Sequence, residues 1–308
     1  MNWLFFSIAT ALLWGTAELF YKKGAQPDEK YSHLKISVWV GVVMGIHAIY
    51  TLLTQDINYN PVNLLIYLPV SLFYIFSMTF SYFGMRFLEE SISDPIENTA
   101  GVICVLLFAI FMGDEFSALT WIAVAVITVG VVGVSFVENR GETTRKKNYG
   151  KKLAVIAFCM PFVYALLDAF GTFLDDAFFL VEDIAAAPFV DVTEETMEAV
   201  ANTSYELTFA LFALGLFIFM KAKKVKFGPV KQHKDKILAA VFETAGQFTY
   251  VYALGVADAI AAPIISSVCV VSLVLSRIFL KEKLPRKTYA FIAIVIIGIL
   301  LLAVAEEL

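Results

Sequence analysis

Charged residues are scarce in this chain of 308 residues. Charged residues make up 17% of the chain and hydrophobic residues 59%. A typical soluble domain has about 25% charged residues. The mean hydropathy of +0.77 is too high for one soluble core to hide, because a folded protein of this size still exposes much of its surface. The composition therefore excludes an ordinary soluble globule and predicts a surface that faces lipid.

Cysteine is also rare, with three residues in the chain. Cys104, Cys159 and Cys269 all fall inside apolar runs, where a free thiol behaves as a small hydrophobic group. We expect no disulfide, no metal site and no cofactor. The 23 basic residues against 28 acidic ones leave a net negative charge, which argues against a nucleic-acid partner.

Long apolar runs take the place of these missing features. A hydrocarbon core of roughly 30 Å needs about 20 apolar residues per helix, and runs such as 119–137 do not show the alternation of a barrel strand. We predict an all-α membrane protein embedded in the lipid bilayer. Its ten expected transmembrane helices are 3–21, 34–53, 63–87, 95–112, 118–137, 153–174, 204–220, 237–256, 260–280 and 288–304.

The basic residues lie in or next to the predicted connections on one side of the membrane. With ten spans, every Lys and Arg falls on one face, in 22–35, Arg86, 140–152, 221–236 and 277–287. The positive-inside rule makes this face cytoplasmic. We therefore predict a multi-pass plasma-membrane protein with both termini and the acidic 175–203 loop outside.

The chain also repeats itself. At an offset of 168, Pro95 aligns with Pro263, Phe111 with Phe279 and Gly130 with Gly298, and at an offset of 150, Trp14 aligns with Tyr164 and Glu18 with Asp168. Two five-helix repeats are expected, 1–141 and 150–308, the second holding the long acidic loop 175–203. Because five is odd, the second repeat is inverted, which is typical of alternating-access carriers.

In this arrangement the chain resembles the ten-helix EamA-type carriers of the drug/metabolite transporter superfamily. The residues that carry the resemblance are Trp14-Gly15, Pro95, Pro263, Asp114 and Glu282. The resemblance implies proton- or exchange-coupled transport of small metabolites, drugs, amino acids or nucleotide-linked sugars. The chain departs from the family in Tyr164-Ala165, where Trp-Gly would match, and in basic loops on the face opposite to the usual one.

We single out four acidic residues inside predicted helices, Glu18, Glu97, Asp168 and Glu243. An intramembrane acid costs at least about 2.5 kcal/mol and marks a functional site by default. No Lys or Arg lies deep in a predicted helix, so a cationic substrate, a coupled proton or both would neutralise these acids.

Glu18 and Asp168 are the strongest candidates for binding substrate or proton. Trp14 precedes Glu18 by one turn, and Tyr164 precedes Asp168 in the same way. A carboxylate beside an aromatic ring suits a desolvated ammonium group. The alternative for Glu18 is an interfacial ion pair with Lys22.

Further candidates have structural alternatives as well. Glu243, Gln247 and Tyr250 share a helical face, as Tyr74 does with Tyr67 and Ser81, but such groups also join helices by hydrogen bonds. Glu97 follows Pro95 in the expected first turn of a helix, where an acid complements the helix dipole. His47 is a proton relay or a packing residue.

These features together predict a secondary active transporter of a small polar, cationic or amine-bearing metabolite. One alternative is a carrier of a neutral or anionic metabolite whose acids serve proton coupling only, and a second is a non-transporting receptor or scaffold. We expect no catalytic residues. Substrate identity, transport direction, coupling ion and oligomeric state stay open.

Overall fold

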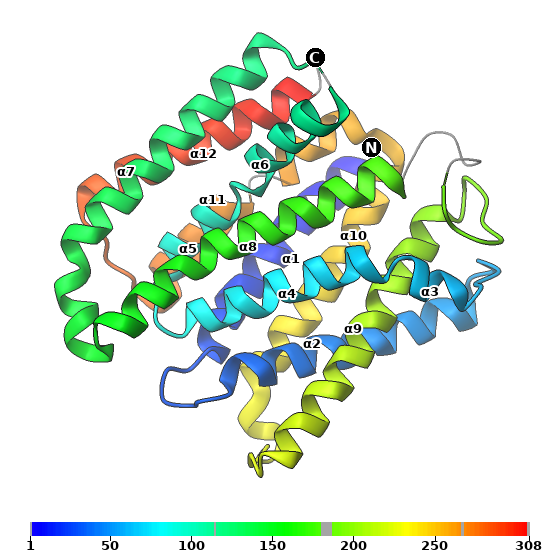
Figure 1. Cartoon of the computed structure of the whole chain (residues 1–308), viewed down its shortest axis with the longest axis horizontal. Helices are drawn as coiled ribbons and strands as arrows, with labels where there is room; N and C mark the ends of the chain where they lie inside the picture. The colour runs from blue at the N-terminus through cyan, green and yellow to red at the C-terminus, as the bar shows by residue number, and fades with distance from the viewer. Residues whose placement is uncertain (1, 114, 180–186, 266–267, 307–308) are drawn as a thin grey trace.

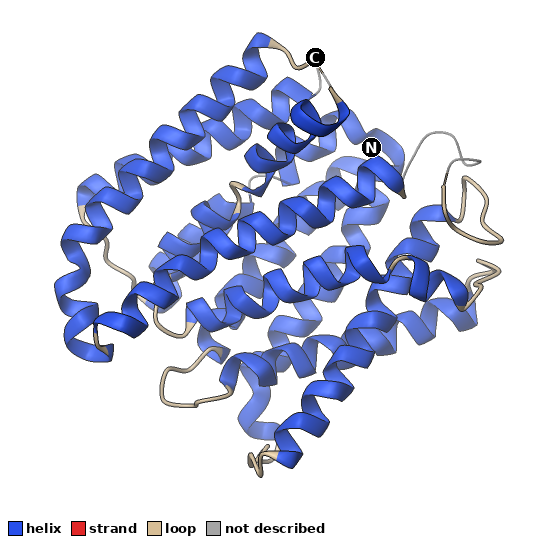
Figure 2. Ribbon diagram, in the orientation of Figure 1, coloured by secondary structure: helices blue, strands red, loops and turns tan. Residues whose placement is uncertain are grey.

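The computed structural model describes residues 2–113, 115–179, 187–265 and 268–306. Within these ranges the chain is helical and contains no strand (Figure 2). Asp114, one of the residues behind the family resemblance, lies outside them. The predicted all-α class is confirmed for the part of the chain that the structure describes.

The helices of the first half are α1 (Asn2–Gly24), α2 (Ser32–Thr54), α3 (Val62–Ile66), α4 (Leu68–Met85), α5 (Glu90–Glu97), α6 (Ala100–Leu107), the π-helix η1 (Phe108–Met112) and α7 (Ala118–Tyr149). Those of the second half are α8 (Lys151–Phe178), α9 (Met197–Ala222), the 3-10 helix η2 (Val230–His233), α10 (Lys234–Ile265), α11 (Val268–Leu275), the π-helix η3 (Ser276–Leu280) and α12 (Arg286–Glu306).

Several predicted helix boundaries are wrong. The predicted helix 63–87 is broken at Tyr67, just before Pro69, since proline cannot donate a helical hydrogen bond. The predicted helix 95–112 begins earlier, at Glu90, and its α-helical part is interrupted between Glu97 and Ala100. Conversely, α10 runs on through 256–260, where we expected a connection. The stretch 257–262 is rich in alanine, which favours helix.

Six helical segments of the described residues are long and apolar enough to cross a membrane, and two shorter apolar helices accompany them. The six are Leu4–Gly24, Ser32–Thr54, Leu68–Met85, Glu90–Met112, Lys151–Phe178 and Met197–Ala222. The shorter pair is Ala118–Val134 and Val268–Leu280. The protein is therefore a multi-pass membrane protein.

The main packing partners come from opposite halves of the chain (Figure 1). Helix α1 packs on α10, α4 on α8, α2 on α9 and α7 on α12. Helices α1, α4, α8 and α10 form the middle of the bundle, with α2 and α9 on one side of them and α7 and α12 on the other (Figure 1).

Elements of the two halves also correspond at the offset of 168. The bounds of α6 and η1 match those of α11 and η3, and each π-helix ends at a residue with positive φ, 77° at Gly113 and 57° at Lys281. In the α7–α12 contact, a Cβ on Gly130 would lie 2.6 Å from Val295, and one on Gly298 would lie 2.6 Å from Ile127. These two glycines let the backbones approach closely.

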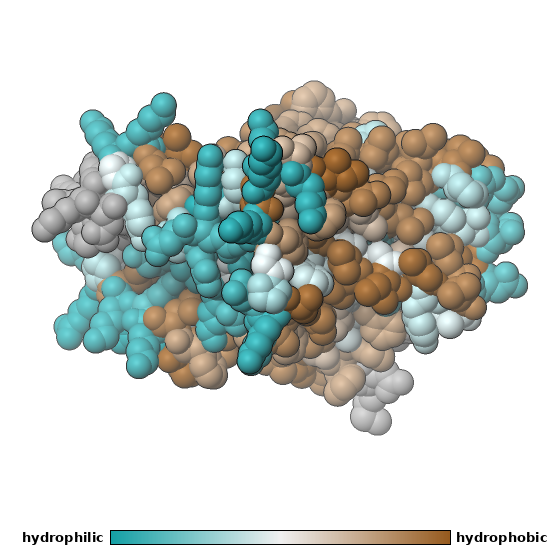
Figure 3. Space-filling view, turned by 90° about the horizontal axis from the view of Figure 1, so that it is seen from below, coloured by the Kyte–Doolittle hydropathy of each residue, from teal (hydrophilic) through white to brown (hydrophobic). Residues whose placement is uncertain are grey.

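Hydrophilic residues gather toward the two ends of the bundle in Figure 3, with hydrophobic residues between them. At one end Arg86 donates to the carbonyl oxygens of Gln26 and Pro27, and Lys35 donates to that of Lys226. We call this end, where the connections that follow α1, α4 and α9 meet, the basic end. At the opposite end Asn63 exchanges hydrogen bonds with the backbone of Val190.

Candidate functional site

A cavity of about 630 Å³ lies within the middle of the bundle, between α1, α4, α5, α8, α9 and α10. Eight carboxyl groups and eight aromatic rings line it, and the lining residues that the structure describes include no Lys, Arg or His. The acids are Glu18, Asp94, Glu97, Asp168, Asp175, Asp176, Glu198 and Glu243, and the aromatics are Trp14, Tyr21, Tyr67, Tyr74, Tyr82, Tyr164, Tyr205 and Tyr250.

Nine of the ten residues predicted from the sequence as binding residues line this one cavity. They are Glu18, Asp168, Trp14, Tyr164, Glu243, Gln247, Tyr250, Tyr74 and Glu97. They come from five different helices, so the folded bundle brings together rows that the sequence could only place on separate helices. Their roles in binding stay predictions.

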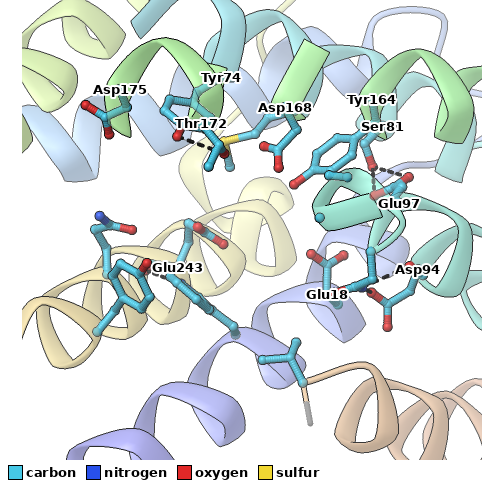
Figure 4. Close-up of a pocket in the computed structure, with 18 of the residues that line it drawn as sticks. Glu18, Tyr74, Ser81, Asp94, Glu97, Tyr164, Asp168, Thr172, Asp175 and Glu243 are labelled. Carbon is cyan, nitrogen blue, oxygen red and sulfur yellow. Dashed lines mark hydrogen bonds between the residues drawn. The ribbon is translucent and has the colours of Figure 1, made fainter. Parts of the chain in front are cut away.

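Glu18 and Asp168 face the cavity from α1 and α8 (Figure 4). The Oε2 atom of Glu18 is buried and has no hydrogen-bond partner. Lys22, the alternative partner of Glu18, donates to the carbonyl oxygens of Met85 and Leu88 at the end of α4. Lys22 therefore directs hydrogen bonds to the backbone at and just after the end of α4.

Glu97 lies at the end of α5 rather than in the first turn of a helix, so the structural alternative, an acid at a helix start, is wrong. Its carboxylate accepts hydrogen bonds from Ser81 Oγ at 2.8 and 2.9 Å and from Ser93 Oγ at 2.7 Å. The error arises because the helix begins before Pro95, which lies inside α5.

Asp94, which is 4% exposed, was not among the residues predicted from the sequence. Asn98 Nδ2 donates to Asp94 Oδ1 at 2.7 Å, and Ser272 Oγ of α11 donates to Oδ2. Asp94 precedes the predicted start of its helix by one residue, so the rule for intramembrane acids did not reach it.

Trp14 and Tyr250 form an aromatic wall, with ring centroids 5.1 Å apart and planes inclined by 36°. Trp14 Nε1 donates to the carbonyl oxygen of Glu243 at 3.3 Å. A Cβ at position 246 would lie 2.4 Å from the indole, so Gly246 is what lets Trp14 pack against α10. Gln247 continues this wall toward α9 by donating to Asn202 Oδ1 at 3.2 Å.

Asp175 and Asp176 were expected in the acidic loop, but α8 continues to Phe178, and both residues line the cavity. Tyr67 OH donates to Asp175 Oδ1 at 2.7 Å, and Tyr74 OH donates to Thr172 Oγ1 at 3.1 Å. The predicted loop boundary at 175 is therefore wrong, and the cavity extends toward the end of the bundle opposite the basic end.

His47 is the one predicted binding residue outside the cavity. Its Nδ1 lies 2.8 and 2.9 Å from the two carboxylate oxygens of Glu206 on α9, and their side chains are 21% and 0% exposed. Glu206 falls inside the predicted span 204–220 and was overlooked. The rule that selected Glu18 would have found it.

A membrane-spanning helical bundle with a polar cavity between its halves belongs to the class of small-molecule transporters. The model of the EamA-like transporter family matches residues 1–136 and 185–304. The chain belongs to this family, within the drug/metabolite transporter superfamily, as the resemblance predicted. It is therefore a membrane transporter of small molecules, and the family is one of transporters rather than enzymes.

Comparison with solved structures gives fifteen matching chains. One, titled only as the crystal structure of a protein, covers 100% of this chain and 99% of its own, with a TM-score of 0.58 and 13% sequence identity. This likeness concerns the fold alone. No curated protein matches the chain.

Proposed function

We propose that the protein is a secondary active carrier of a small cationic or amine-bearing metabolite. The observation that carries this proposal is the cavity with eight carboxyl groups and no basic side chain among the lining residues that are described. Buried carboxylates without a cation are costly. An ammonium group would neutralise them and also interact with the tyrosine rings.

Protons are the second species that these acids can hold. When no cation is bound, protonation removes the cost of the buried charges. A carboxyl group that releases its proton as the substrate enters would couple the two fluxes in opposite directions. Glu18 and Asp168 are our candidates for this exchange, with Glu97 and Glu243 beside them.

Alternating access between two inverted five-helix repeats, 1–141 and 150–308, is the mechanism that we propose. Its support is the match of α6 and η1 with α11 and η3 at the offset of 168, the shared start of α7 and α12 at the same offset, and the corresponding contacts between the two halves. The α1–α10 contact corresponds to α8–α4, and the α1–α11 contact corresponds to α8–α6.

The described conformation leaves the cavity reaching toward Asp175 and Glu198, whereas side chains tie the connections together at the basic end. If the basic end is cytoplasmic by the positive-inside rule, this conformation faces outward. Both termini then lie outside the plasma membrane, on the side of the acidic residues that follow α8.

Uptake into proteoliposomes tests the proposed function. We expect labelled amines to accumulate when an outwardly directed proton gradient is imposed, and to accumulate much less without it. Amino acids, sugars and sugar phosphates are assayed in parallel. Proton-coupled uptake of a neutral or anionic compound without any amine uptake would overturn the cationic assignment.

A further inference from the structure

We propose that the substrate is an elongated aliphatic dication, with one ammonium group at each end of a flexible chain. This inference rests on the proposed function, because it assumes that the acidic cavity admits cations. It goes further by assigning two separate ammonium positions inside the same cavity.

Two labelled carboxyl groups of the cavity, Asp168 and Asp175, lie along α8, and Glu243 faces the same cavity from α10 (Figure 4). Asp168 faces the inner group, which Glu18, Asp94 and Glu97 complete, while Asp175 lies at the other end of the view. Seven residues separate Asp168 from Asp175, so their Cα atoms are roughly 10 Å apart along the helix. One ammonium group cannot contact both positions, whereas the two ends of a diamine can.

On α4, α8 and α9, the side chains that lie between Asp168 and Asp175 are neutral. Tyr74 and Tyr205 meet edge to face with centroids 6.0 Å apart, and Tyr205 OH lies 3.3 Å from the sulfur of Met78. With Thr172 they provide aromatic and apolar surface on which a methylene chain can pack without leaving polar groups unpaired.

The two ends of the cavity differ in burial, which suggests how a dication enters. Asp94 and Glu97 are 4% and 5% exposed, and Glu18 Oε2 is buried and unpartnered. By contrast, Asp175 is half-buried and its neighbours Asp176 and Glu198 are exposed. The inner ammonium group would lose its water and donate a hydrogen bond to Glu18 Oε2. The outer ammonium group would stay partly hydrated beside Asp175.

The test compares butylamine with putrescine, which has the same carbon chain and a second ammonium group, and adds cadaverine and ethylenediamine. We expect putrescine and cadaverine to reach half-maximal uptake at a concentration at least tenfold lower than butylamine. Ethylenediamine, whose two nitrogens are closest together, should bridge the two groups less well and gain less over butylamine than putrescine does. Equal uptake of butylamine and the diamines would overturn the dication proposal but leave the proposed function standing.

The variant Asp175→Asn identifies the outer position. Its amide oxygen can still accept the hydrogen bond from Tyr67, so the fold is retained, and butylamine uptake reports this directly. We expect the preference for putrescine over butylamine to fall at least tenfold. Glu195→Gln, on the exposed surface and outside the cavity, is the matched control. A preference for putrescine that is unchanged in Asp175→Asn would overturn the assignment of the outer position. Failure of the original protein to move any amine would overturn the proposed function as well.

Discussion

The carboxylates at the basic end and those in the cavity have different partners. At the basic end, Glu29 is held by Lys35 at 2.6 Å and by Lys236 at 2.9 Å. Burial raises the pKa of Glu29, but the hydrogen bonds from the two lysines outweigh it, so the pKa lies below its ordinary value. In the cavity, the hydrogen-bond donors to Glu97 and Asp94 are hydroxyl and amide groups.

This difference separates structural acids, which are paired with lysines, from acids that are available to bind a ligand. Lys35 and Lys236 join the connection after α1 to α2 and α10, and so close one end of the bundle. No comparable cation lines the cavity in the part of the chain that the structure describes. The supply of a cation, rather than the burial of the acid, therefore distinguishes the two regions.

The largest effect is expected for Asp168→Asn in the cavity. Losing one partner of a desolvated charge pair costs about 2–5 kcal/mol, so amine uptake should fall at least tenfold. Thermal stability should stay the same or rise, because a buried carboxyl group without a cation is removed. Proteoliposome uptake and a thermal unfolding scan are measured together. A variant that transports like the original protein would remove Asp168 from the binding site.

The His47–Glu206 pair should give the opposite result. Glu206→Ala leaves the imidazole without its carboxylate, and breaking such a buried pair costs about 3 kcal/mol of stability. We expect a lower midpoint of thermal unfolding in detergent, with amine binding retained by the fraction that stays folded.

A double-mutant cycle with His47→Ala checks that the effect belongs to the pair. Since the two residues contact each other, the double variant should be no less stable than the less stable single variant. Additive losses would show that the two side chains act independently. A selective loss of transport at unchanged stability would instead make this pair functional and blur the distinction between paired and unpaired acids.

The two glycines of the α7–α12 contact test whether the two halves of the chain are equivalent. A Cβ at Gly130 or at Gly298 meets a backbone nitrogen at 2.9 Å in the facing helix. Overpacking of this kind costs about 1–3 kcal/mol, so Gly130→Ala and Gly298→Ala should lower the unfolding midpoint by similar amounts. Gly215→Ala, where the space is open, is the control. Clearly unequal effects of the two glycines would argue against the repeat.

Helical spacing and the rule for intramembrane acids were enough to select nine residues that share the cavity, including four of its eight acids. Glu18 and Trp14 illustrate this, because both are read from a single apolar helix. Asp94 illustrates the limit, since its partner Ser272 comes from the other half of the chain. Spacing along one helix carries no information about a contact of that kind.

Helix ends were predicted less well, again for physical reasons. Pro95 was taken as a helix start, although the segment before it is already helical and Glu282 accepts hydrogen bonds from the backbone N–H groups of Glu90 and Ser91 at the beginning of α5. Asp175 was assigned to a loop because it is charged, yet tertiary contacts such as that with Tyr67 extend α8 past it. In both cases packing overrides the local preference on which the prediction rested.

The smallest expected effect concerns Glu29 and pH. Because its folded pKa is lowered, its contribution to stability is present above the unfolded value of about 4.3 and is lost as the pH falls through the folded value. Glu29 is partly exposed, so the contribution should not exceed about 1 kcal/mol. Between pH 6 and pH 3, the unfolding midpoint of the original protein should fall more steeply than that of Glu29→Gln, and the two should converge at the acidic limit. Parallel curves over this range would mean that the two lysines contribute nothing through Glu29, and the contrast between the basic end and the cavity would lose its energetic basis.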